Sequence, residues 1–271
     1  MSDQITIDFY QVDAFTQHAF GGNPAAVCPL EKWLSDNDLQ KIAEENNLSE
    51  TAFLVAENDG YRLRWFTPAV EVDLCGHATL ASAWVLFNLL GYAKNQIKFF
   101  TRSGELTVTQ SGEELCMDFP AKKTVSIDAP ANLLTALGIS SANVISVHKS
   151  DDILVEVNHE QIIENLAPDF NLLNSVDTRG VIVTSRSAEF DFISRWFGPR
   201  VGVNEDPVTG SAHTTLAPYW QNKIGNKRFK AQQGGQRKGY LDCQVSEDGS
   251  RVLLFSHACL VISGQFYLSK T

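Results

Sequence analysis

Two polar turns with the same layout contain the residues that could do chemistry. The layout is a W-F-x-P segment, then an aspartate and a glycine turn, and it occurs at residues 65–77 and again at 196–211. Gly76 and Gly91 are 15 positions apart, as are Gly210 and Gly225, so each turn opens a run of the same length. This duplication predicts two homologous halves related by a pseudo-twofold axis, with one polar turn from each half lining a cleft.

Each glycine turn is expected to begin a helix. A helix N-terminus presents unpaired backbone N–H groups and a partial positive charge, and glycine lets a ligand approach the backbone closely. Gly76-His77 and Gly210-Ser211 therefore suit a carboxylate group. The alternative is that the glycines are ordinary turn residues and Ser211 an ordinary helix cap. The occurrence of the same device in both copies favours the binding site.

Glu50 is the candidate acid/base that the pattern places on a strand. It stands just before the apolar segment Thr51–Val55, and strand alternation puts it on one face with Ala52 and Leu54. If that face is internal, burial raises the pKa of the carboxyl group, which suits general acid/base catalysis, and we expect a raised pKa. The residue pattern alone is more typical of a surface charge at the start of a strand.

The turns also contain His77, Asp206 and Cys75. His77 and Asp206 could orient a ligand or move protons, or be a hydrogen-bonded loop histidine and a solvated turn aspartate. Cys75 lies where a helix N-terminus would stabilise a thiolate, although a buried inert cysteine fits equally. The matching position of the second copy holds no cysteine. Histidine and cysteine spacing shows no metal-ligand pattern, so no metal site is predicted.

The elements that must position these residues are mostly short strands. Ile5–Val12 alternates as a strand does, and Thr51–Ala56 and Arg62–Phe66 flank a turn. Ser35 is a good N-cap for a helix. The run Ala78–Leu90 is hydrophobic nearly all round, which predicts a helix wrapped by other elements.

Composition excludes several classes of protein. The chain has 271 residues, of which 44% are hydrophobic, enough for two cores. A net charge of −10 argues against nucleic-acid and anionic-membrane partners. Met1–Tyr10 does not resemble a signal peptide, and the longest apolar stretch, Thr79–Leu90, is too short to span a bilayer. Five cysteines without close pairs suit free thiols in the cytoplasm.

At these residues the chain resembles the PhzF-like phenazine biosynthesis family, which is related to diaminopimelate epimerase and proline racemase. The segments that match are Asp13–Thr16, Gly22–Val27, Leu48–Phe53, Phe66–Pro68, Leu74–Thr79 and Asn204–Ala212. The resemblance implies an α+β, diaminopimelate epimerase-like fold, in which each half is a curled, mostly antiparallel sheet around a central helix. The halves are expected at 1–118, joined by the C-terminal strand 259–271, and at 119–258.

The resemblance also implies roles for residues. In the phenazine enzyme, the glutamate of the S-E-T motif isomerises trans-2,3-dihydro-3-hydroxyanthranilate without a cofactor, and Glu50 occupies that position. His77, Asp206 and Ser211 match other polar members of that site. Cys75 matches the first thiol of the cysteine-dependent epimerases, whereas Asp206 takes the place of the second, which argues against a two-thiol racemisation.

The resulting hypothesis is a cofactor-independent isomerase of a small carboxylate, located in the cytoplasm and possible as a homodimer. The catalytic candidates are Glu50, His77 and Asp206, and the substrate-binding candidates are Asn23, Gly76, Gly210 and Ser211. One alternative is an amino-acid racemase or epimerase that uses Cys75. The other, from a different class, is a small-carboxylate binding protein without turnover.

Overall fold

The computed structural model of the chain describes residues 4–269, which fall into two compact units. The first unit contains the described residues up to Asp118 and from Phe255 onward, and the second contains Phe119–Leu254. The chain passes from one unit to the other within β8 (Glu114–Pro120) and again within β17 (Arg251–Ser256). None of the helices in this described part is long and apolar enough to cross a membrane.

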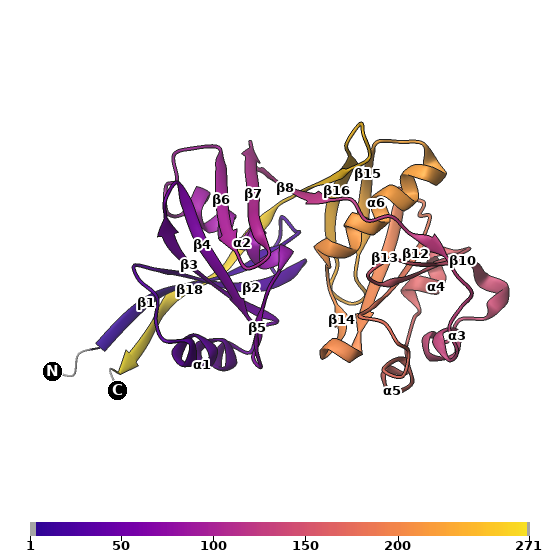
Figure 1. The fold of residues 1–271 in the computed structure, drawn as a ribbon, viewed down its shortest axis with the longest axis horizontal. Helices are drawn as coiled ribbons and strands as arrows, with labels where there is room; N and C mark the ends of the chain where they lie inside the picture. Colours follow the sequence, from indigo (N-terminus) through magenta and orange to yellow (C-terminus); the bar gives the residue numbers. More distant parts are fainter. Residues whose placement is uncertain (1–3, 270–271) are drawn as a thin grey trace. The chain divides into compact units, whose positions relative to one another are not determined.

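The first unit consists mainly of strands (Figure 1). Its remaining elements are β1 (Gln4–Ala14), β2 (Asn23–Leu30), α1 (Asp36–Asn46), β3 (Glu50–Glu57), β4 (Gly60–Phe66), β5 (Glu71–Val72), α2 (Gly76–Asn88), β6 (Gln96–Thr101), β7 (Gly104–Ser111) and β18 (Ala258–Ser269).

The second unit also consists mainly of strands with a few helices. Its elements are β9 (Val125–Ser126), α3 (Leu133–Leu137), the 3-10 turn η1 (Ser141–Asn143), β10 (Val144–Lys149), β11 (Ile153–Val157), α4 (Glu160–Glu164), α5 (Phe170–Leu173), β12 (Val181–Ser185), β13 (Phe192–Gly198), the 3-10 turn η2 (Pro199–Val201), β14 (Val203–Asp206), α6 (Gly210–Ile224), β15 (Arg228–Gln233) and β16 (Gly239–Val245).

The two units pair their strands in the same order. In the first, β1–β2 is antiparallel, β2–β3 parallel, β3–β4 antiparallel, β4–β6 parallel and β6–β7 antiparallel. In the second, β10–β11, β11–β12, β12–β13, β13–β15 and β15–β16 repeat these five directions. The duplication in the sequence therefore extends to the topology. Strand β18 pairs antiparallel with β1.

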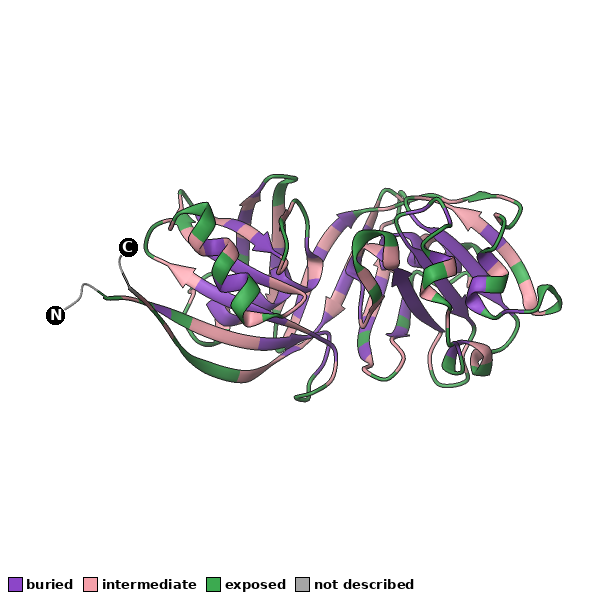
Figure 2. Cartoon of the chain, turned by 90° about the horizontal axis from the view of Figure 1, so that it is seen from below, coloured by how far each residue is buried: buried purple, intermediate pink, exposed green. Residues whose placement is uncertain are grey.

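Helix α2 is buried on nearly every side, as its composition predicts. Nine of its residues are buried, and the helix contacts β1, β2, β3, β7 and β18 (Figure 1). Helices α2 and α6 begin at Gly76 and Gly210, which confirms that both glycine turns open a helix. In each unit, burial follows the strands, whereas many of the connecting turns are exposed (Figure 2).

Local signals account for the smaller helix of the first unit. The hydroxyl of Ser35 accepts a hydrogen bond from the Asp38 amide at 3.2 Å and caps α1, as predicted. Leu39 and Ile42 then pack into an apolar core with Phe53 and Phe66. The second unit has the short α4 and α5 in the corresponding place. Sequence reasoning missed both, because four or five residues are too few to show a helical period.

A substitution that creates a cavity beside α2 tests whether the buried helix stabilises the first unit. Leu80 is fully buried, so Leu80→Ala should lower the free energy of unfolding by about 2–5 kcal/mol. Leu90→Ala is the matched control, because Leu90 is 44% exposed, and it should change stability by less than about 0.5 kcal/mol. Urea unfolding followed by circular dichroism measures both. Equal effects of the two substitutions would contradict a helix buried on all sides.

Candidate active site

Glu50 and His77 meet as a buried pair in the first unit. Glu50 is the first residue of β3, where it lies opposite Ala25 of the parallel strand β2. His77 is the second residue of α2. The Nε2 atom of His77 is 3.1 Å from Oε2 of Glu50, and the side chains are 7% and 18% exposed. The inward orientation that strand alternation suggested for Glu50 is therefore present.

Three further side chains surround the His77 ring. Nδ2 of Asn23 lies 3.3 Å from Nδ1, and Oγ of Ser49 lies 3.3 Å from Nε2. Sγ of Cys75 is 3.5 Å from Nδ1 and 4.0 Å from Nε2. We call these five residues, Asn23, Ser49, Glu50, Cys75 and His77, the Glu50 cluster.

Backbone geometry holds the members of the cluster in place. Asn23 begins β2 directly after Gly22, which has a φ of 56°. A Cβ added to Gly22 would collide with the Ala14 carbonyl, so the turn requires glycine. Cys75 is the N-cap of α2, and the Thr79 hydroxyl donates to its carbonyl at 2.6 Å. The turn before β2 thus positions Asn23, and the turn before α2 positions Cys75.

The charges of the pair stabilise each other. Burial by itself raises the pKa of Glu50, but the adjacent His77 more than offsets it, and the net direction is downward. The expected upward shift is therefore wrong, because that expectation took burial into account but not the charge of His77 beside the carboxylate. Burial also acts to lower the pKa of His77, yet its neighbours Cys75 and Glu50 raise it well above 6.5. The pair is best described as a carboxylate with an imidazolium.

Cys75 differs from the thiolate that its position at a helix N-terminus suggested. Burial and the nearby Glu50 carboxylate raise the pKa of this thiol. A raised pKa disfavours the thiolate that the helix end was expected to stabilise. All five cysteines of the chain are free thiols, as predicted.

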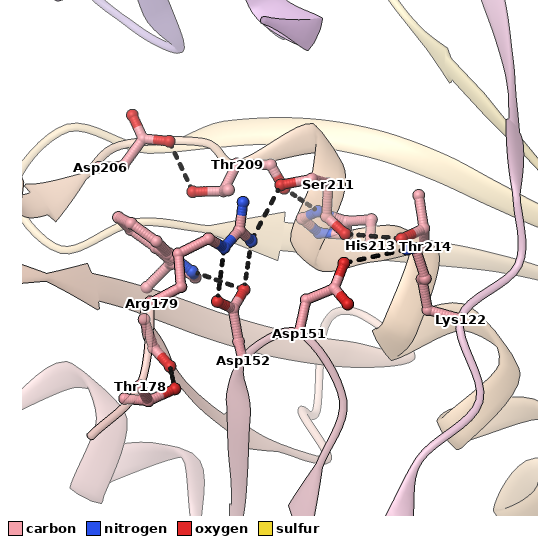
Figure 3. Close-up of polar contacts among 12 residues, drawn as sticks. Lys122, Asp151, Asp152, Thr178, Arg179, Asp206, Thr209, Ser211, His213 and Thr214 are labelled. Atoms are coloured by element: carbon pink, nitrogen blue, oxygen red, sulfur yellow. Dashed lines mark hydrogen bonds and ion pairs between the residues drawn. The ribbon is translucent and has the colours of Figure 1, made fainter. Parts of the chain in front are cut away.

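The second unit gathers another set of polar residues around the start of α6 (Figure 3). Oδ2 of Asp206 accepts a hydrogen bond from the Thr209 hydroxyl at 2.6 Å. The Thr209 amide donates to Oε1 of Gln233 at 3.0 Å. Ser211, the second residue of the helix, accepts a hydrogen bond from Nη2 of Arg179 at 3.3 Å.

Arg179 is a member of this set that sequence reasoning missed. The Arg179 guanidinium donates two hydrogen bonds to the buried Asp152 carboxylate, at 2.8 and 2.6 Å. The Trp196 indole donates a third at 3.0 Å. A Cβ on Gly180 would collide with that indole. Trp196 belongs to the duplicated segment, but Asp152 and Arg179 lie in unrelated stretches that no motif joins.

The predicted site residues therefore lie in two groups. Asn23, Glu50, Cys75, Gly76 and His77 come together in the first unit, and Asp206, Gly210 and Ser211 come together in the second. The cleft that would join the two groups stays a prediction. Ser49 was overlooked as a partner of His77, although it stands beside Glu50 in the sequence.

Comparison with known proteins identifies relatives over nearly the whole chain. The family model described as phenazine biosynthesis-like protein matches residues 12–264. An uncharacterized isomerase of Pseudomonas aeruginosa is 58% identical over 262 residues, which cover 97% of this chain and 99% of the relative.

Solved structures show the same similarity. A PhzF family protein of Enterococcus faecalis superposes with a TM-score of 0.94 at 43% identity, covering 97% of this chain and all of that one. A probable proline racemase from Agrobacterium radiobacter, at 12% identity, has a TM-score of 0.61 and covers 97% of this chain and 93% of its own. The predicted α+β, diaminopimelate epimerase-like fold is confirmed.

The two buried histidines of the central helices should titrate on opposite sides of the ordinary value. We expect His77 to titrate above 6.5, whereas burial lowers the pKa of His213 to about 4, since it has only the Thr209 carbonyl as a raising partner. Glu50→Gln should lower the pKa of His77 and leave that of His213 unchanged. Imidazole NMR titration measures both. A His77 that titrates below 6.5 in the wild-type protein would rule out the ion pair.

Proposed function

Because this chain belongs to the phenazine biosynthesis-like (PhzF) family, we propose that it is a cofactor-independent isomerase that moves a proton on a small carboxylate. One observation carries the proposal, the buried contact of 3.1 Å between Glu50 and His77. A carboxylate beside an imidazolium pairs a proton acceptor with a proton donor in one largely buried site. Proton transfer from one carbon to another requires such a general base and general acid.

In this proposal, Glu50 removes a proton from a carbon of the substrate and returns it elsewhere. His77 stabilises the carboxylate form of Glu50 in the resting protein and hydrogen-bonds the substrate, with Asn23 on its other ring nitrogen. Asp206 orients an amino or hydroxyl group of the substrate. The amides of Gly76 and Gly210 and the Ser211 hydroxyl bind the carboxylate and stabilise the negative charge that develops.

The runner-up is a racemase or epimerase that uses Cys75 as a base. The observation in its favour is the distance of 3.5 Å between Sγ and Nδ1 of His77, which would allow the imidazolium to stabilise a Cys75 thiolate. The raised pKa of the buried thiol opposes it. A carboxylate-binding protein without turnover is the third candidate. A cytoplasmic location and a homodimer stay predictions.

Proton exchange separates the three functions. The protein is incubated in D2O with trans-2,3-dihydro-3-hydroxyanthranilate and a panel of small amino and hydroxy acids, and deuterium is followed by NMR. Exchange without stereoinversion is expected for the proposed isomerase. Inversion would favour the racemase, and tight binding without any exchange would favour the binding protein.

Two substitutions then assign the base. Glu50→Gln keeps the shape of the side chain and removes the base, so it should lower the exchange rate at least about a hundredfold while binding changes only a few-fold. Cys75→Ala should cost far less. Near wild-type exchange by Glu50→Gln together with an inactive Cys75→Ala protein would assign the reaction to the thiol.

Carboxylate binding tests the second group of residues. Ser211→Ala should weaken binding of a small carboxylate such as citrate by about 2–10-fold, the range for one hydrogen bond. Ser141→Ala, a substitution at an exposed serine of the same unit, should have no effect. Isothermal titration calorimetry compares the two variants with the wild-type protein. Equal affinity in all three would remove Ser211 from the proposed site.

A further inference from the structure

Three side chains of the Glu50 cluster are of the types that bind zinc. Glu50, Cys75 and His77 each offer one ligand atom, and these atoms all lie within 4.8 Å of one another. Carboxylate, thiolate and imidazole are the three protein ligands that Zn²⁺ uses most. We propose that these residues form a binding site for one thiophilic divalent cation of the Zn²⁺ class, and that the bound cation inhibits the enzyme.

The distances suit such a cation after small side-chain movements. Zinc bonds of about 2.0–2.3 Å in tetrahedral geometry place neighbouring ligand atoms about 3.3–3.6 Å apart. Nε2 of His77 is 3.1 Å from the Glu50 carboxylate oxygen and 4.0 Å from the Cys75 sulfur. The first distance must lengthen and the second must shorten, each by only a few tenths of an ångström. The third distance, from the Glu50 oxygen to the Cys75 sulfur, is within 4.8 Å and must also reach this range. We expect rotation of the Cys75 and Glu50 side chains to supply these movements.

Charge balance also favours a divalent cation. A Glu50 carboxylate, a Cys75 thiolate and a neutral His77 imidazole together carry a charge of −2, which one Zn²⁺ ion neutralises. A metal-bound site without net charge avoids the large cost of a net charge in a buried place.

The neighbours of the three ligands fit a metal-bound histidine. When Nε2 binds a metal, Nδ1 carries the ring proton and needs an acceptor. Asn23 is 3.3 Å from Nδ1, and half a turn of its amide presents the oxygen to that proton. Three protein ligands leave a fourth position for water or a substrate oxygen, as in open zinc sites.

Inhibition is the part of this inference that rests on the proposed function. A cation on Glu50 occupies the lone pairs that would take the substrate proton. Zn²⁺ should therefore stop proton exchange, and a chelator such as EDTA should restore it. Binding itself does not depend on any activity, so it is measured separately.

The binding experiment uses Cd²⁺, which reports on thiolate ligands through ultraviolet charge-transfer absorption. Titration of the protein with one equivalent of Cd²⁺ should give this absorption, and added Zn²⁺ should abolish it by competition. Cys75→Ser should abolish the absorption. Glu50→Gln, which keeps the thiol, should weaken Cd²⁺ binding at least about tenfold, the lower end for disturbing a metal site.

Cys116→Ser is the matched control, because Cys116 is a half-buried thiol outside the cluster. It should leave the Cd²⁺ affinity unchanged within about twofold. Absence of the absorption in the wild-type protein, its survival in Cys75→Ser, or its loss in Cys116→Ser would each overturn the proposal. If Cys75→Ser does not fold, an unchanged Cd²⁺ affinity in Glu50→Gln overturns it instead. Metal binding by a protein that shows no proton exchange would support the site while contradicting the proposed function.

Discussion

The contact between Glu50 and His77 is the constraint on which the first unit depends. Two ionised side chains removed from water cost several kcal/mol each unless they are held close together. Closeness in turn requires that the first residue of β3 and the second residue of α2 keep fixed positions. The β2–β3 register fixes the position of Glu50, and the burial of the apolar helix α2 fixes that of His77. The apolar core thus determines the electrostatics of the polar cluster.

The same closeness brings together three side chains of types that exchange protons and bind cations. The deprotonated forms of Glu50, Cys75 and His77 can each accept a proton or bind a metal ion. The proposed proton transfer and the proposed metal inhibition would both follow from this one arrangement of side chains.

The second unit repeats the topology of the first but not its polar residues. Strand order and the central helix recur, because both depend on apolar residues that pack in the same way. The polar residues differ: Arg179 donates to Ser211 at the start of α6, whereas in the first unit Glu50 lies against His77 at the start of α2.

Sequence by itself determined the features that depend on local spacing. The W-F-x-P segments and glycine turns revealed the duplication, Ser35 marked the start of α1, and Ala78–Leu90 indicated a wrapped helix. The resemblance to a family then named Glu50 as the candidate base. Only the tertiary structure decided the pKa directions of Glu50 and Cys75 and the contacts of Ser49 and Arg179. These properties depend on burial and on charges brought together from distant segments, which no spacing along the chain encodes.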